Sequence, residues 1–218
     1  MAEEFRFQEM FPHGEDKTPY RRIEGDFTGT ETLRGERILT IDPAGLRKLT
    51  AEAIRDVSHL FRPGHLAQLR KILDDSEASP NDHFVARNML RNATVSAGMI
   101  LPSCQDTGTA IVLGKKGQRV WTGGGDEEAI AHGVWDTYVG TNLRYSQLSP
   151  VSVFEEANTG NNLPAQIDLY AVDGDEYHFL YITKGGGSAN KTFLFQETKA
   201  LLNPESPVSY THLRAHET

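Results

Sequence analysis

The hydrophobic pattern of the chain changes its period near residue 100, and this change constrains the fold more than any other feature. Before that point, apolar residues recur at helical spacing in three stretches. Two of these stretches begin with a capping residue followed by proline, Asp42-Pro43 and Ser79-Pro80, which is typical of a helix start. Beyond that point, short strand-like runs alternate with turn residues. Helices followed by separate strands predict an α+β domain with antiparallel strands.

The same patterns predict the individual elements. The expected helices cover residues 42–61, 66–73, 80–92, 126–138 and 193–202. The expected extended segments cover residues 20–23, 37–41, 109–113, 119–122, 166–172 and 177–183. Two turns should close hairpins between neighbouring strands: Gly114–Gly117 and Asp173–Glu176. Pro63-Gly64 should end the first helix.

A length of 218 residues suggests one domain, or slightly more than one. Proline and glycine interrupt residues 1–41 too often for a long helix, so we interpret this segment as an N-terminal arm. Residues 42–205 carry the helices, the expected hairpins and a glycine-rich loop, and form the main domain. Residues 206–218 form a separate tail.

Composition excludes several classes of protein. The net charge is −8, from 22 basic and 30 acidic residues, which disfavours binding to nucleic acid or to an anionic membrane. The single cysteine, Cys104, cannot form an intramolecular disulfide bond, so a disulfide-framed secreted domain is excluded. No apolar run is long enough to span a bilayer, and the acidic N-terminus does not look like a signal peptide. We therefore expect a cytosolic protein with no membrane partner.

Cys104 is the first candidate for chemistry. It lies on a polar loop between an expected helix and an expected strand, where a thiolate can be stabilised. A free cysteine is also often a small buried residue, and both interpretations stay open. The eight histidines show no metal-ligand spacing, so a metal at Cys104 would need ligands from elsewhere in the sequence or beyond it.

Two further segments could bind an anion. Gly185–Thr192 resembles a phosphate-binding loop in the placement of Lys191 and Thr192, but Asn190 replaces its last glycine. This segment is either a nucleotide-binding module or a glycine loop that binds another anion, such as a carboxylate. Arg144 is either a carboxylate clamp or a surface ion-pair residue.

Gly123–Gly125 forms a second glycine run, which we interpret as structural. It lets the chain leave a strand and enter a helix that Asp126 should cap.

Several long segments of the chain closely resemble the class I fumarate hydratases, the iron–sulfur fumarases. The resemblance runs from about residue 5 to Pro204. The segments that carry it are Leu101–Ala110 (LPSCQDTGTA), Gly114–Asp126 (GKKGQRVWTGGGD), Asn142–Gln147 (NLRYSQ), Asn158–Gly160 (NTG), Asn162–Tyr177 (NLPAQIDLYAVDGDEY) and Lys184–Thr192 (KGGGSANKT).

This resemblance implies a hydro-lyase that interconverts (S)-malate and fumarate plus water, usually as a homodimer. It implies a [4Fe–4S] cluster held by three cysteines, whose open iron acts as a Lewis acid. Cys104 is then one cluster ligand. Gln105 and Asp106 contact the dicarboxylate substrate, and Asp106 is also the expected catalytic residue, in proton handling. Arg144 binds a substrate carboxylate, and Gly187 contacts the substrate.

The chain departs from the family in two respects. Family members are more than twice as long, and their other two cluster cysteines and a proposed threonine base lie beyond the point where this chain ends. Residues 206–218 do not resemble the family and look like translated vector sequence. We therefore interpret the chain as the truncated N-terminal part of a longer enzyme, inactive alone, with a foreign tail. The nearest alternative is an L-tartrate dehydratase α-type subunit.

Overall fold

The computed structural model describes residues 4–12, 14–15 and 19–185. The expected helix at 193–202, Gly187 and the tail at 206–218 therefore lie outside the described residues. Within them, the elements in chain order are β1 (Thr28–Leu33), β2 (Glu36–Ile41), α1 (Pro43–His59), α2 (Pro63–Asp74), α3 (Pro80–Ser96), β3 (Thr109–Gly117), β4 (Val120–Trp121), α4 (Asp126–Gly140), β5 (Leu148–Pro150), β6 (Glu156–Asn158), β7 (Gln166–Val172) and β8 (Tyr177–Lys184). This order confirms the predicted α+β class.

The helix starts follow the capping signals of the sequence. The Asp42 side chain accepts a hydrogen bond from the backbone N–H of Ala44 at the start of α1. Ser79 and Asp82 form a reciprocal capping box at the start of α3. The first helix, α1, ends at His59, four residues before Pro63, and Pro63 instead occupies the first turn of α2. α3 continues to Ser96, four residues beyond the predicted end.

The prediction of a hairpin at Asp173–Glu176 is wrong. β3 lies between β7 and β8, parallel to β7 and antiparallel to β8. The connection instead crosses the end of β3, where Gly117 and Arg119 donate backbone hydrogen bonds to the carbonyls of Glu176 and Gly174. Because β3 lies between them, β7 and β8 are two strand spacings apart, about 9–10 Å, and four residues can span this distance. The turn signal alone therefore cannot distinguish this crossing from a hairpin.

The prediction of a hairpin at Gly114–Gly117 is also wrong. These residues continue β3, and the following strand, β4, pairs in parallel with β2 in a different sheet. Gly114 is needed for close packing rather than for a turn, because a β-carbon there would lie 2.6 Å from Leu169 Cδ2. The hairpin that does form joins β1 to β2 through Arg34 and Gly35, both at positive φ. β1, β5 and β6 were not predicted.

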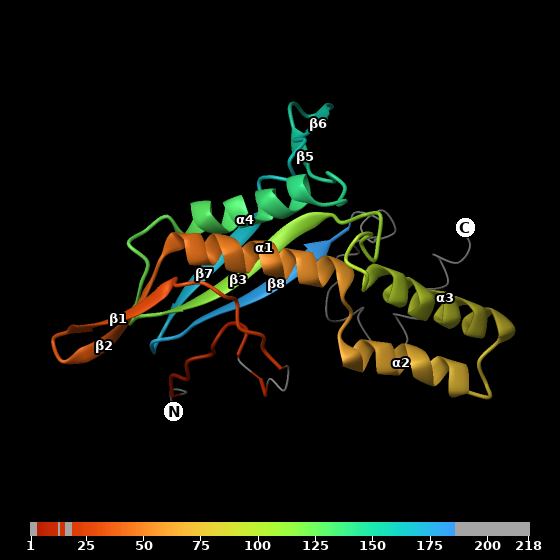
Figure 1. Ribbon diagram of the computed structural model, residues 1–218, viewed down its shortest axis with the longest axis horizontal. Helices are drawn as coiled ribbons and strands as arrows, with labels where there is room; N and C mark the ends of the chain where they lie inside the picture. The colour runs from red at the N-terminus through yellow and green to blue at the C-terminus, as the bar shows by residue number, and fades with distance from the viewer. Residues whose placement is uncertain (1–3, 13, 16–18, 186–218) are drawn as a thin grey trace.

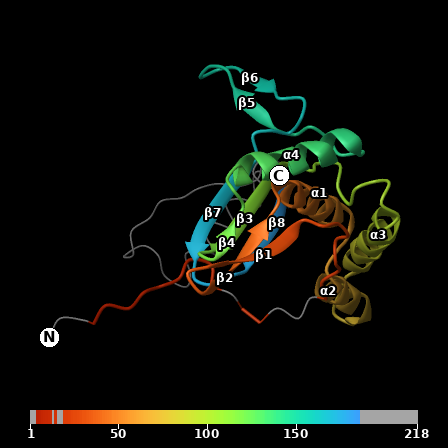
Figure 2. The same cartoon turned by 60° about the vertical axis from the view of Figure 1, so that its left-hand side comes forward.

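The helices α1 and α4 lie side by side and cover one face of the β7-β3-β8 sheet (Figures 1 and 2). Gly133 of α4 allows this close approach, because a β-carbon there would lie 2.4 Å from the carbonyl oxygen of Arg47 in α1. Arg47 also binds both carboxylate oxygens of Asp136, at 2.6 and 2.8 Å.

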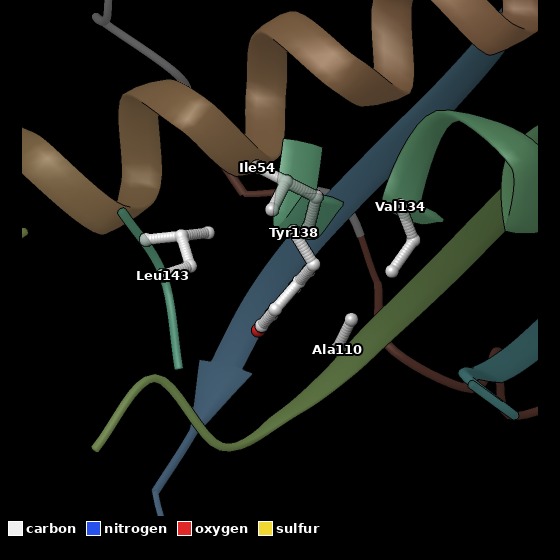
Figure 3. Packing of buried hydrophobic residues seen from close by; sticks show 5 residues of the cluster. All are labelled: Ile54, Ala110, Val134, Tyr138 and Leu143. Atoms are coloured by element: carbon white, nitrogen blue, oxygen red, sulfur yellow. The ribbon is translucent and has the colours of Figure 1, made fainter. Parts of the chain in front are cut away.

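The core lies between these helices and the sheet, and one of its clusters contains Ile54, Ala110, Val134, Tyr138 and Leu143 (Figure 3). Full burial of a side chain such as Ile54 or Val134 stabilises the folded state by roughly 1.5–3 kcal/mol. The helices α2 and α3 pack on each other at one end of the molecule, and the β5–β6 hairpin projects away from the body (Figure 1). None of the described helices is long and apolar enough to cross a membrane.

Candidate functional site

The loop between α3 and β3 carries Cys104, Gln105 and Asp106. The residue before Cys104 is held on both sides: the Ser103 backbone N–H donates to the Ser58 carbonyl (2.8 Å), and the Asn92 side chain donates to the Ser103 carbonyl (2.6 Å). Cys104 itself is a free, exposed cysteine. The structure therefore does not support the interpretation of Cys104 as a small buried residue.

The segment that carries Arg144 lies beside this loop. The Thr107 hydroxyl donates a hydrogen bond to the Arg144 carbonyl (2.8 Å), and the Asn142 side chain donates to the Ile100 carbonyl (3.0 Å). The Arg144 side chain is exposed, and it forms no ion pair with any residue in the described part of the chain. The interpretation of Arg144 as half of a surface ion pair therefore finds no partner among those residues.

The start of the glycine-rich loop closes against the same loop. Gly108 has a φ of +60°, and a β-carbon there would lie 1.8 Å from the Lys184 carbonyl oxygen. A β-carbon on Gly185 would lie 2.8 Å from the Asp106 carbonyl oxygen and 3.0 Å from the Asp106 carboxyl carbon. The backbone thus brings the chain at Lys184-Gly185 into direct contact with the loop that holds Asp106.

Tyr138, on α4, supports the loop from the core side, and sequence reasoning did not identify it. Its hydroxyl group donates to the carbonyls of Thr107 (3.0 Å) and Gly108 (3.1 Å), and Figure 3 shows the hydroxyl at the end of the ring farthest from α4. Burial raises the pKa of Tyr138 to about 12; the side chain of Thr107 opposes this shift and the charge of Asp106 adds to it. Tyr138 therefore stays protonated and able to donate at neutral pH. In the sequence it looks only like an apolar residue near a helix end.

The predicted site residues thus come from three segments that meet. Gln105 and Asp106 lie on the Cys104 loop, and Arg144 lies on the adjacent segment. The predicted Gly187 lies outside the described residues, but Gly185, at the start of the same glycine-rich loop, lies against Asp106. A guanidinium group can hold a small carboxylate through two parallel N–H donors. Among the described residues, no group of three or more His, Cys, Asp or Glu side chains could hold a metal ion.

The second glycine run does not belong to this site. It follows the opposite end of β3, and Gly125 at a φ of +71° is the N-cap of α4, which corrects the prediction that Asp126 is the cap. Asp126 instead accepts hydrogen bonds from Lys116 (2.8 Å), Tyr177 (3.1 Å) and Thr122. Burial alone would raise the pKa of Asp126, but these donors together lower it below its ordinary value.

The strand that precedes Gly185 argues against a nucleotide-binding loop. A phosphate-binding loop follows a strand of a parallel sheet, whereas β8 pairs antiparallel with β3. Residues 186–192 themselves lie outside the described residues.

Comparison with known proteins identifies the family. The family model described as "Fumarate hydratase (Fumerase)" matches residues 47–211. The match ends inside the segment 206–218, and the foreign origin of that segment stays a prediction. The chain is 56% identical over 200 residues to the anaerobic class I fumarate hydratase of Escherichia coli K12, which is 92% of this chain and 36% of that protein. It is 52% identical over 202 residues to fumarate hydratase 2 of Leishmania major, which is 92% of this chain and 35% of that protein.

The similarity to tartrate dehydratases is weaker. The chain is 27% identical over 129 residues to the L(+)-tartrate dehydratase subunit alpha of Escherichia coli UTI89, covering 57% of this chain and 42% of that protein. The chain spans little more than a third of the length of the fumarate hydratases that it matches. Since the family model covers most of its residues, the chain belongs to the fumarate hydratase (Fumerase) family.

Proposed function

We propose that this chain forms the N-terminal part of a fumarate hydratase that interconverts (S)-malate and fumarate plus water. The observation that carries the proposal is the hydrogen bond from the Thr107 hydroxyl to the Arg144 backbone carbonyl, which holds the Cys104–Asp106 loop beside the segment that carries the candidate carboxylate clamp. The names of the relatives at 52–56% identity support the same reaction.

In this proposal each residue acts on a dicarboxylate. The Arg144 guanidinium binds one substrate carboxylate through two parallel N–H donors. The Gln105 amide and Asp106 contact the substrate from the neighbouring loop, and Gly187 contacts it from the glycine-rich loop. Asp106 takes part in proton transfer while malate loses a proton from its CH2 carbon and the hydroxyl group of the neighbouring carbon, together as water. The exposure of Gln105 and Arg144 is consistent with direct access to a ligand.

The resemblance also implies a [4Fe–4S] cluster with Cys104 as a ligand. An exposed thiol on an anchored loop fits one ligand position. The chain has no second cysteine, and its described residues offer no cluster of metal-binding side chains, so by itself it does not fit a complete cluster site. The other ligands would come from outside this chain. Homodimer formation and a cytosolic location are part of the same proposal.

A chimera tests the proposed function. Replacing the matching 200 residues of the anaerobic Escherichia coli enzyme with the corresponding residues of this chain should give a protein that converts malate to fumarate. The intact Escherichia coli enzyme, prepared in parallel under anaerobic conditions, is the control. A folded, iron-loaded chimera with no turnover of malate or fumarate would contradict the proposal. Turnover of tartrate in preference to malate would favour the tartrate dehydratase alternative.

A further inference from the structure

Asn162 contacts both of the segments that meet at the candidate site. Its side-chain N–H donates to the Gly108 carbonyl (2.7 Å), on the Cys104 loop. Its side-chain oxygen accepts from the backbone N–H groups of Ser146 and Gln147 (2.9 Å each), which follow Arg144 closely in the chain. One amide group therefore spans the gap between the two segments.

The surroundings of Asn162 leave little room for another side chain. Asn162 is fully buried, with 0% of its surface exposed, and its φ is +60°. Asparagine is one of the few residues other than glycine that adopt this left-handed conformation readily. It also combines a donor and an acceptor on a short side chain, and both are needed here because the Gly108 carbonyl accepts while the two amides donate.

The three hydrogen bonds of Asn162 complement the contact between Thr107 and Arg144. Thr107 precedes Gly108, so the loop is held to the Arg144 segment at two consecutive positions. If the segments separated, the buried amide of Asn162 would lose its partners, which is unfavourable in an apolar interior. This arrangement favours one relative position of the two segments over all others.

We propose that Asn162 is a positioning residue, which holds Asp106 and Arg144 in register so that both act on one substrate molecule. This proposal rests on the proposed function for its kinetic consequence. Asn162 does not contact the substrate itself; it acts through the backbone of Gly108 on one side and of Ser146 and Gln147 on the other.

The main test uses Asn162→Gly, which keeps the left-handed backbone without strain and removes all three hydrogen bonds. The matched control is Asn161→Ala, because the Asn161 side chain accepts only a local hydrogen bond from Leu163. In the chimera, Asn162→Gly should lower kcat/KM at least about tenfold, whereas Asn161→Ala should leave it within about twofold. Asn162→Asp keeps the acceptor for Ser146 and Gln147 but loses the donor to Gly108, and it provides a second variant if the glycine variant does not fold.

A double variant separates positioning from a merely structural role. If Asn162 acts through Arg144, Asn162→Gly combined with Arg144→Lys should cost little more in kcat/KM than the larger of the two single losses. Losses that multiply, or an Asn162→Gly protein with lower stability but unchanged kcat/KM, would overturn the proposal.

A measurement on the 218-residue chain is independent of activity. Cys104 is the only cysteine, so a spin label there reports the motion of the loop. Asn162→Gly should increase the mobility of the label and speed hydrogen exchange at Ser146 and Gln147, and Asn161→Ala should change neither. Unchanged mobility and exchange in Asn162→Gly would overturn the positioning role even if the chimera is active. An inactive chimera with the expected changes would count against the proposed function alone.

Discussion

Gly108 and Lys184 touch through their backbones, at a distance that no side chain on Gly108 would allow. This contact joins the Cys104 loop to the end of β8, although the two lie more than seventy residues apart in the chain. The loop is thus held by α1 and α3 at Ser103, by α4 at Thr107 and Gly108, and by β8 at Gly108.

Gly108→Ala should destabilise the protein severely. The left-handed backbone alone costs an alanine roughly 1–2 kcal/mol, and the new methyl group would overlap the Lys184 carbonyl. We expect a loss of at least about 2 kcal/mol in the free energy of unfolding, measured by urea denaturation. Gly140→Ala is the control, because a β-carbon there meets nothing within 4 Å. Equal stabilities of the two variants would contradict the backbone contact.

Tyr138→Phe should destabilise the protein by about 1–3 kcal/mol, because two buried carbonyls lose a donor while the packing of the ring is kept. Tyr145→Phe is the control, since Tyr145 is 40% exposed. Urea denaturation at neutral pH measures both variants. A loss for Tyr138→Phe no greater than for Tyr145→Phe would show that the hydroxyl group contributes nothing to the loop.

The same tyrosine gives a prediction at high pH. The pKa of Tyr138 rises from 10.0 to about 12 on folding, mainly through burial, so the folded state binds a proton that the unfolded state has already released between these values. Stability should therefore fall as pH rises from 10 towards 12, by about 1.4 kcal/mol per pH unit for this group. The fall should be smaller in Tyr138→Phe, which keeps Tyr177 and Tyr181, whose pKa values burial also raises. Identical slopes in the two proteins would contradict this assignment.

Arg144→Lys in the chimera should lower kcat/KM for malate at least about tenfold, equivalent to about 1.4 kcal/mol of transition-state binding. Lysine keeps the charge but loses the planar group that binds two carboxylate oxygens. Arg70→Lys is the control, because Arg70 pairs only with Asp74 on the surface of α2. Unchanged kinetics for Arg144→Lys would remove Arg144 from the substrate site.

The isolated 218-residue chain should hold no stable [4Fe–4S] cluster, because it supplies one thiolate where several are required. Anaerobic reconstitution followed by desalting and visible spectroscopy tests this expectation. Cys104→Ser in the same chain measures adventitious iron. A stoichiometric cluster that survives desalting in the wild-type chain, and not in Cys104→Ser, would refute the prediction.

Local signals in the sequence predict the helices and fail for strand pairing. Asp42-Pro43 and Ser79-Pro80 set helix starts because capping depends on residues within one turn. The turn signals at 114–117 and 173–176 are equally local, but strand pairing depends on which third segment lies nearby. Position 114 needs glycine because the Leu169 side chain packs against it. Leu169 lies far away in the chain, so the residues next to Gly114 do not indicate this contact.

The sequence likewise indicates some residues of the candidate site and not others. Cys104 and Arg144 are indicated by their chemistry and by the family resemblance, and Gln105 and Asp106 by the resemblance alone. The structure places all four on adjoining segments. Tyr138 and Asn162 were not identified as site residues, because each acts by hydrogen bonding to backbone groups far away in the chain. Backbone partners leave no chemical signature in the sequence, so only the fold identifies such residues.

The crossing at residues 173–176 has a consequence for how the domain assembles. β7 and β8 are joined by four residues, yet each forms its strand hydrogen bonds with β3 and none with the other. A peptide of residues 166–184 would therefore lack the native partner of both its strands. β3 must therefore lie between them before either strand has its native partner, so this part of the sheet can form only around residues 109–117.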